Sequence, residues 1–234
     1  MGRVFNLRNN LGALYAVFML ERRPDQVKYV FMIGDRQDNL AEVARTDGQF
    51  PDPFACAELD AMWACKYHPI RYNAAELALM PDHSLGAVYS NFMLNRGLRP
   101  DFYDDISPRH KMHYLRMRLR QTHDIWHVLT GFDSDPFGEV GLQGFYFGQV
   151  TNGQPALIFA GAILKSLFRC RFGELERFIV FFCDGYNAGR QSQNLLPVKW
   201  EEHWHDSVVA LRERYAIQQP ACMSTGNPPA ARLA

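Results

Sequence analysis

Two histidines and two carboxylates lie within residues 121–145, and their spacing can place all four around one divalent metal ion. His123 and His127 are four residues apart, so on a helix they share one face. Asp124 lies about 100° around a helix from His123, and Glu139 follows a predicted turn. Imidazole nitrogens and carboxylate oxygens are donors that first-row divalent metals accept. The spacing therefore predicts a metal site made of His123, Asp124, His127 and Glu139.

A plainer interpretation of these residues is a partly solvated helix face, with His123 and Asp124 making local contacts. A pair of histidines four residues apart favours that interpretation when it stands alone. The adjacent aspartate and the glutamate beyond the turn favour a metal instead. Zinc is the first expectation, and magnesium, manganese or iron fit the same donors. A protease of the HExxH type is excluded because Asp124 replaces the glutamate and has a shorter reach.

Arg116 and Arg120 precede the histidines and are candidate substrate-binding residues. On one continuous helix they fall about 20° and about 60° from His123, which extends the metal face toward the N-terminus. Arginine suits bidentate contacts with a benzoate carboxylate or a prenyl phosphate. The alternative is a structural role, in which both residues pair with acidic side chains of a neighbouring helix.

One long helix is expected to carry the histidines. Ser107 and Pro108 are typical of an N-cap and first helical residue, and predict a helix from about 108 to 130. Gly131 is expected to end it.

The next helix is expected to bring Glu139 back toward the histidines. Asp135 and Pro136 repeat the N-cap signal, and Glu139 falls in the first turn that follows. The chain must reverse between the two helices for the four side chains to meet.

The chain is predicted to be all-α, because apolar residues recur at helical spacing and no convincing alternating strand is found. Residues 1–218 are expected to form a single compact multi-helix domain, and residues 219–234 a disordered tail. Further helices are expected before Pro24, at about 27–48, 54–68 and 75–97 (with a break at Pro81-Asp82), and at about 155–170, 173–189 and 199–217.

Composition limits the class of protein. The 234 residues are 47% hydrophobic and 21% charged, which is typical of a globular protein. The formal net charge is zero, so no nucleic-acid partner is expected. Five scattered cysteines without a CxxC pair indicate a reducing compartment and exclude a cysteine zinc site.

His123-Asp124-x-x-His127-x11-Glu139 resembles the signature of the coenzyme Q biosynthesis protein 4 family, the ubiquinone-biosynthesis metal-binding proteins. The similarity covers about residues 5–217. It includes HDIWHVLTG and GEVGLQGF at the site, LMPDHSLGAVYSNFMLNRGLRPDF upstream, and GYNAGRQSQNLL and WEEHWHDSVVALRERYAI downstream.

The resemblance implies an all-helical fold, a bound divalent metal and peripheral association with a bilayer. It also implies a role in the biosynthesis of ubiquinone or another prenyl quinone. The expected reaction is oxidative C1-decarboxylation, a lyase-like step in which a hydroxyl replaces the ring carboxyl of a polyprenyl hydroxybenzoate. The alternative is a non-catalytic scaffold that binds a lipid or isoprenoid and organises the other enzymes. Expected partners are a polyprenyl lipid or quinone precursor, other quinone-biosynthesis proteins, and a second copy in a homodimer.

The expected location is the bacterial cytoplasm, at the inner face of a membrane, because no Arg- and Ser-rich leader precedes the family core. No apolar stretch reaches the roughly 18 residues of a membrane span. Two amphipathic segments, at 3–23 and 157–173, can lie at a bilayer surface. The second is favoured because its basic residues gather at one end, and its alternative is a buried core helix.

Overall fold

The computed structural model describes residues 51–69, 72–98, 108–150 and 153–224. Every element named within those ranges is a helix, and strand pairing there is limited to an isolated bridge between Ser84 and Ser207. The all-α prediction is confirmed; the helices predicted before residue 50 lie outside the described residues. The elements are η1 (Pro53–Ala55), α3 (Ala57–Ala64), α4 (Ala74–Ala78), α5 (Leu85–Asn95), α6 (Lys111–Gln121), α7 (His123–Thr130), α8 (Pro136–Gln149), α9 (Gly153–Phe168), α10 (Phe172–Gln191), η2 (Trp200–Glu202), α11 (Val208–Arg214) and α12 (Ala221–Ser224).

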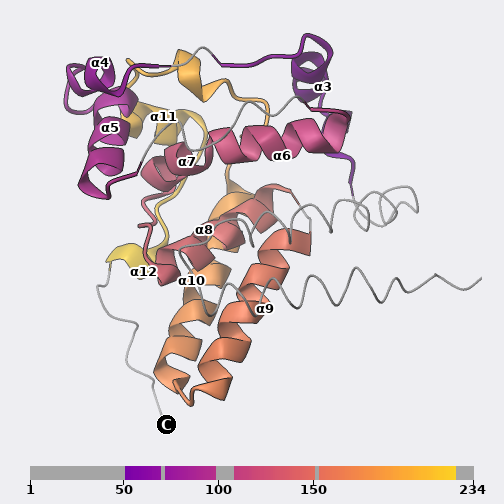
Figure 1. The fold of residues 1–234 in the computed structure, drawn as a ribbon, viewed down its shortest axis with the longest axis vertical. Coiled ribbons are helices and arrows are strands. Elements are labelled where there is room, and N and C mark those ends of the chain that lie inside the picture. Colours follow the sequence, from indigo (N-terminus) through magenta and orange to yellow (C-terminus); the bar gives the residue numbers. More distant parts are fainter. Residues whose placement is uncertain (1–50, 70–71, 99–107, 151–152, 225–234) are drawn as a thin grey trace, which may run out of the picture.

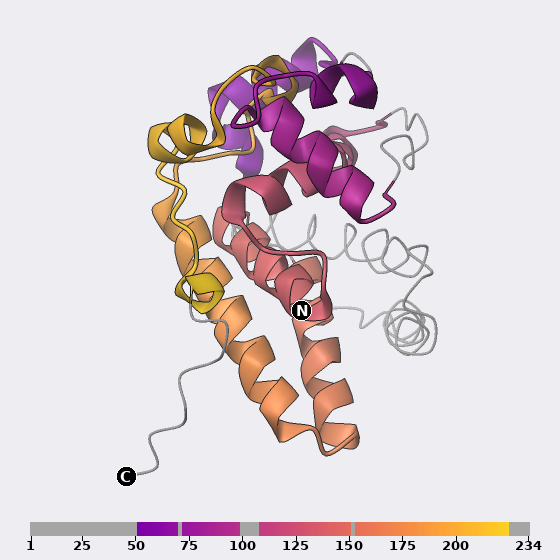
Figure 2. The ribbon, with the colours of Figure 1, turned by 90° about the vertical axis from the view of Figure 1, so that its left-hand side faces the viewer.

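The helices form two groups that meet at α7 and α8. Shorter helices, α3 to α7 and α11, gather at one end of the molecule (Figure 1). The longer helices α8, α9 and α10 pack side by side, and the α9–α10 hairpin extends away from the first group (Figures 1 and 2). The buried core is rich in aromatic side chains, including Trp126, Tyr114, Phe145 and Trp200.

The prediction of a single helix over 108–130 is wrong, because the chain bends at Thr122 and forms α6 and α7 instead. The Thr122 hydroxyl donates to the carbonyl of Arg118 at 3.0 Å. Such a bond back to the preceding turn competes with the helical pattern and bends helices. The predicted start is also wrong: α6 begins at Lys111, where Nδ1 of the N-cap His110 accepts from the amide of His113.

The reversal between α7 and α8 is as predicted. Gly131 has a φ of +86°, the left-handed conformation that ends helices and that glycine adopts without a steric penalty. Asp135 caps α8, and its Oδ1 accepts from the amides of Phe137 at 2.8 Å and Gly138 at 3.3 Å. The first turn of α8 contains Glu139.

The prediction of one helix over 199–217 is wrong, because residues in the middle of that range bond to α5 instead. The carbonyls of Trp204 and Asp206 accept from the amides of Gly86 and Leu85, which lack partners inside α5. This pairing separates η2 from α11. Within the segment predicted to be a tail, Ala221–Ser224 form α12, which contacts α10 through the Cys222 amide that donates to Asp184 at 2.9 Å. Residues 225–234 lie outside the described residues.

The helices α8 and α10 run in the same direction and approach closely through glycines. The ring of Phe137, at the start of α8, contacts that of Phe178, with centroids 4.6 Å apart. A Cβ at Gly144 would lie 2.1 Å from the carbonyl oxygen of Phe182, and one at Gly185 2.0 Å from that of Gly141. Only glycine permits backbones this close, so the contact fixes α8 on α10.

Gly185→Ala is therefore expected to destabilise the protein, because its methyl group forces the two helices apart. Overpacking of this kind costs on the order of 1–3 kcal/mol, and thermal or urea unfolding measures the loss. Gly173→Ala in the same helix is the matched control, since its Cβ would meet nothing within 4 Å. The control is expected to keep or raise stability by up to about 1 kcal/mol. Equal stability of the two variants would contradict the close packing.

Candidate metal centre

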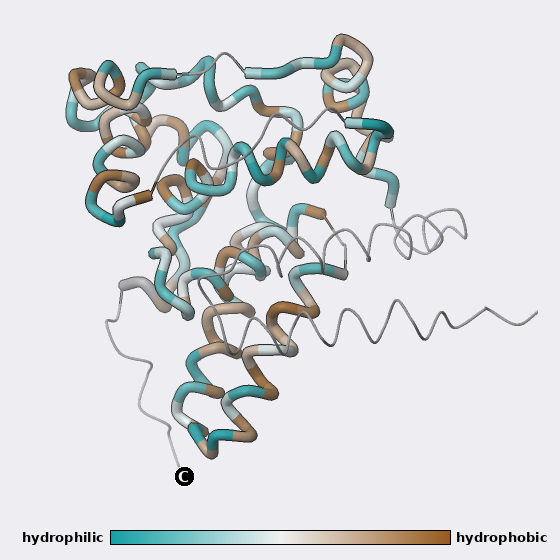
Figure 3. The backbone as a smooth tube through the Cα atoms, in the orientation of Figure 1, coloured by the Kyte–Doolittle hydropathy of each residue, from teal (hydrophilic) through white to brown (hydrophobic). Residues whose placement is uncertain are grey.

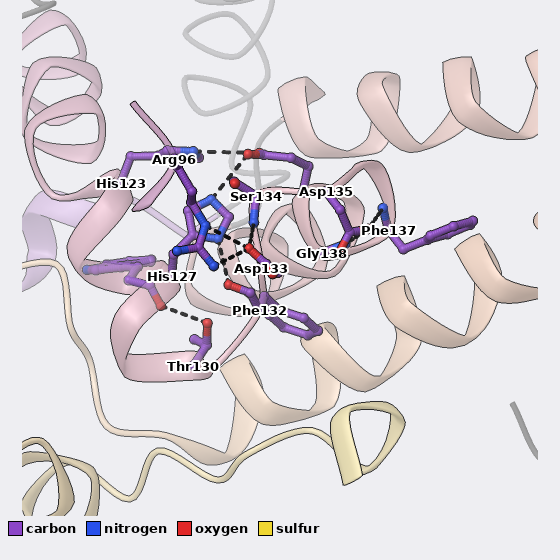
Figure 4. A network of polar contacts seen from close by, with 12 residues as sticks. Arg96, His123, His127, Thr130, Phe132, Asp133, Ser134, Asp135, Phe137 and Gly138 are labelled. Atoms are coloured by element: carbon purple, nitrogen blue, oxygen red, sulfur yellow. Dashed lines mark hydrogen bonds and ion pairs between the residues drawn. The ribbon is translucent and has the colours of Figure 1, made fainter. Parts of the chain in front are cut away.

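At the junction of α7 and α8, His123, Asp124 and His127 lie close together and Glu139 contacts both histidines. In Figure 4 the side chains of His123 and His127 project from α7 toward the start of α8. The Glu139 carboxylate faces both rings: Oε2 lies 3.6 Å from His123 Nε2, and Oε1 lies 3.3 Å from His127 Nε2. Donor atoms of His123, Asp124 and His127 all lie within 4.8 Å of one another. Each of the two histidines thus has both a carboxylate from α7 and a carboxylate from α8 nearby.

The buried ring of His127 presents one nitrogen to this volume. Its Nδ1 lies 2.9 Å from the carbonyl oxygen of Phe132, which can only accept, so Nδ1 carries the proton. Its Nε2 is buried and has no hydrogen-bond partner among the described residues. A ring nitrogen fixed in this way, with its other nitrogen bonded to a carbonyl, is the usual setting of a metal-bound histidine. The residues present therefore fit a divalent metal.

His123 contacts a residue that sequence reasoning missed. The hydroxyl oxygen of Tyr146 lies 3.2 Å from His123 Nδ1, and the hydroxyl donates to the carbonyl of Leu119 at 3.2 Å. Tyr146 follows Glu139 by seven residues, two helical turns along the same face of α8. That spacing is the one signal in the sequence that could have placed Tyr146 near the site.

The carboxylate and the imidazoles of the site influence one another's protonation. Burial acts to raise the pKa of Glu139, but the adjacent imidazoles of His123 and His127 outweigh it and hold that pKa far below its usual range. Burial acts to lower the pKa of His123, yet the neighbouring carboxylates of Glu139 and Asp124 raise it. A metal bound at the Nε2 atoms would compete with protonation of these rings.

Arg96, the C-cap residue of α5, holds the turn between α7 and α8. Nε of Arg96 donates to Oδ1 of Asp133 at 2.8 Å (Figure 4), and this hydrogen bond lowers the pKa of Asp133. The Arg96 guanidinium also lies 3.9 Å from the ring centroid of Phe92, which stacks on His127. The stack and the ion pair together connect α5 to the His127 ring and to the reversal that precedes Glu139.

A second arginine, Arg212 of α11, fixes the end of α7. It donates from Nε to the carbonyl of Leu129 at 2.8 Å and from a terminal nitrogen to that of Val128 at 3.0 Å. These carbonyls lie in the last turn, where helical partners are lacking and a positive charge is favourable. Sequence reasoning missed Arg96 and Arg212, because each is far from the site in the chain.

Arg116 and Arg120 lie on α6, across the Thr122 bend from the histidines. Both are half-buried, and neither is free of interactions. The angles between these arginines and His123 were calculated for one straight helix, so they do not hold across the bend. Their role in binding substrate stays a prediction.

The sequence is similar to those of known proteins. The family model described as coenzyme Q (ubiquinone) biosynthesis protein Coq4 matches residues 68–221. The protein named ubiquinone biosynthesis protein coq4, mitochondrial, from Sclerotinia sclerotiorum is 30% identical over 147 residues, 62% of this chain and 50% of that protein. Its counterpart from Botryotinia fuckeliana is 29% identical over 147 residues, 62% of this chain and 51% of that protein. The chain thus spans about half the length of these curated relatives.

A solved structure shares the fold. The crystal structure of a Nostoc punctiforme protein named for ubiquinone biosynthesis superposes with a TM-score of 0.73 and 28% sequence identity. The alignment covers 90% of this chain and 99% of that one. The family model spans well over half of the sequence and includes all four candidate metal ligands. The chain therefore belongs to the coenzyme Q (ubiquinone) biosynthesis protein Coq4 family.

Proposed function

We propose that this protein uses a divalent metal at His123, Asp124, His127 and Glu139 to act on the aromatic headgroup of a polyprenylated quinone precursor. The observation that carries the proposal is the buried Nε2 of His127, which faces Glu139 while its Nδ1 is bonded to a carbonyl. Family membership supports the pathway, and the donor set supports the metal.

The proposed reaction is oxidative C1-decarboxylation of a polyprenyl hydroxybenzoate. Replacing the ring carboxyl by a hydroxyl with dioxygen releases carbon dioxide and water, and consumes two electrons and two protons. The reaction therefore needs an electron donor as well as oxygen. A bound divalent metal would stabilise negative charge on a phenolate or carboxylate.

The chain's own residues would hold and orient the reactants. His127 and Glu139 join α7 to α8 at the metal, and Phe92 covers one face of the His127 ring. Arg116 and Arg120 remain the candidate partners of the substrate carboxylate, through charge-assisted hydrogen bonds.

A non-catalytic scaffold is the second candidate function. It is favoured by the contacts of Glu139 with His123 and His127, which already brace α7 against α8 without a metal. In that case the lipid and the other quinone-biosynthesis proteins bind, but no substrate is converted. The predicted homodimer would serve either function.

A lipid surface is the proposed location of the protein. In the part of the chain that the structure describes, no helix is both long enough and apolar enough to cross a bilayer. The end of the α9–α10 hairpin, residues 164–172, exposes large apolar side chains: Phe168 is 83% and Phe172 61% exposed. Hydrophobic and hydrophilic residues meet at this end (Figure 3).

Basic residues surround the exposed apolar side chains of the hairpin end. Lys165, Arg169 and Arg171 lie there, and Arg171 pairs with Glu174 at 2.8 Å. Interfacial anchors typically combine two kinds of side chain: apolar side chains enter the bilayer, and neighbouring cationic side chains contact the lipid phosphates. This charge complementarity favours an anionic bilayer as the partner of the hairpin end.

Metal binding is expected to require His127. His127→Ala should weaken zinc binding by at least about 100-fold, because a direct ligand contributes more than the groups that orient it. Elemental analysis after dialysis, on protein whose fold is verified by circular dichroism, measures the loss. His205→Ala removes an exposed histidine and is expected to keep the metal. A His127→Ala variant that retains full zinc occupancy would contradict the site.

The catalytic proposal predicts turnover. We expect metal-loaded protein to convert a polyprenyl hydroxybenzoate to the hydroxylated product and carbon dioxide when dioxygen and a chemical reductant are supplied. Mass spectrometry of the lipid detects the product. Glu139→Gln is expected to slow the reaction by at least about 100-fold, since a charged ligand is lost. Stoichiometric binding of the lipid without product would instead support the scaffold.

Membrane binding is expected to depend on the hairpin end. Leu164→Glu with Phe168→Glu should abolish cosedimentation with vesicles that contain anionic lipid, because charge replaces the side chains that enter the bilayer. Both residues are exposed, so the fold is expected to survive. Leu79→Glu with Leu94→Glu is the matched control, at exposed positions directly after α4 and on α5. Equal binding by both double variants would rule out the hairpin end, and concentration-dependent self-association through it would indicate a protein interface instead.

A further inference from the structure

The hydroxyl of Tyr146 lies between a metal-facing histidine and a backbone carbonyl. It donates to the carbonyl of Leu119, and its oxygen lies 3.2 Å from Nδ1 of His123. A phenol has one proton to donate, and the carbonyl can only accept. Because that proton goes to Leu119, the oxygen must accept from His123, whose Nδ1 then carries the ring proton. His123 Nε2, the atom that faces Glu139, keeps its lone pair.

The surroundings leave this hydroxyl little freedom to move. Tyr146 is buried, and its ring stacks on that of Trp126, with centroids 4.7 Å apart and planes 24° apart. The carbonyl of Leu119 is available because it lies in the last turn of α6, where helical partners are lacking. The bend at Thr122 thus supplies the acceptor that orients the hydroxyl.

The two histidines differ in what fixes them. His127 Nδ1 bonds to a backbone carbonyl, which no side-chain substitution removes, whereas His123 Nδ1 bonds to a side chain. We propose that Tyr146 is a positioning residue of the metal centre: it holds His123 in the Nδ1–H tautomer so that Nε2 can bind the metal. The inference rests on the metal site proposed above and deepens it. Groups that orient a ligand in this way typically affect metal affinity by about 10- to 100-fold.

Tyr146→Phe tests the inference, because it removes the hydroxyl and keeps the stacked ring. Zinc affinity, measured by competition with a chelator, is expected to fall by about 10- to 100-fold. Tyr114→Phe is the matched control: it removes another hydroxyl that donates to a carbonyl, that of Tyr67 at 2.9 Å, from a fully buried ring. The control is expected to bind zinc as the wild type does.

A second measurement separates orientation from general loss of stability. Long-range proton–nitrogen NMR of the zinc-loaded wild type is expected to show His123 protonated at Nδ1 and zinc-bound at Nε2. In Tyr146→Phe the Nδ1 proton of His123 is expected to exchange faster with water, while that of His127 is unchanged.

The outcomes distinguish this inference from the proposed metal site. Zinc binding that is equally tight in wild type and Tyr146→Phe would overturn the role of Tyr146 alone. His123 bound to zinc through Nδ1 in the wild type would overturn it even if the variant did not fold. A wild type that binds no zinc would overturn the metal site and this inference together.

Discussion

The contact of one carboxylate with two imidazoles on another helix is the interaction on which the rest of the site depends. Glu139 reaches both rings only because α7 ends and α8 begins within a few residues. The left-handed Gly131, the Asp135 cap and the Arg96–Asp133 ion pair each hold one part of that reversal. Without it, the two histidines would have no carboxylate from a second helix beside them.

The two helices of the site are fixed by different means. Close glycine packing against α10 sets the position of α8. Caps set the position of α7: Arg212 binds its last carbonyls, and the Thr122 bend separates it from α6. The same bend supplies the carbonyl that accepts from Tyr146, so a local backbone feature affects the orientation of His123. The donor set and its geometry thus make this junction the candidate metal site.

Sequence reasoning predicted the parts of the site that depend on local spacing. The four candidate ligands lie within 17 residues, and the glycine and Asp-Pro signals that bring them together are local too. Arg96 and Arg212 could not be predicted, because their partners are distant in the chain and ion-pair or capping roles leave no periodic pattern. The Thr122 bend was missed because apolar residues continue at helical spacing through it. The prediction of a helix over 199–217 was wrong because residues in the middle of that range form backbone hydrogen bonds with α5.

The most direct test of the account is the position of the metal itself. A crystal grown with zinc and measured at the zinc absorption edge locates the ion without reference to activity. The account predicts one anomalous peak between α7 and α8, at about 2.0–2.1 Å from Nε2 of both His123 and His127. Carboxylate oxygens of Asp124 and Glu139 are expected to complete the coordination. A peak elsewhere, or a zinc ion bound through the Nδ1 atoms, would contradict it.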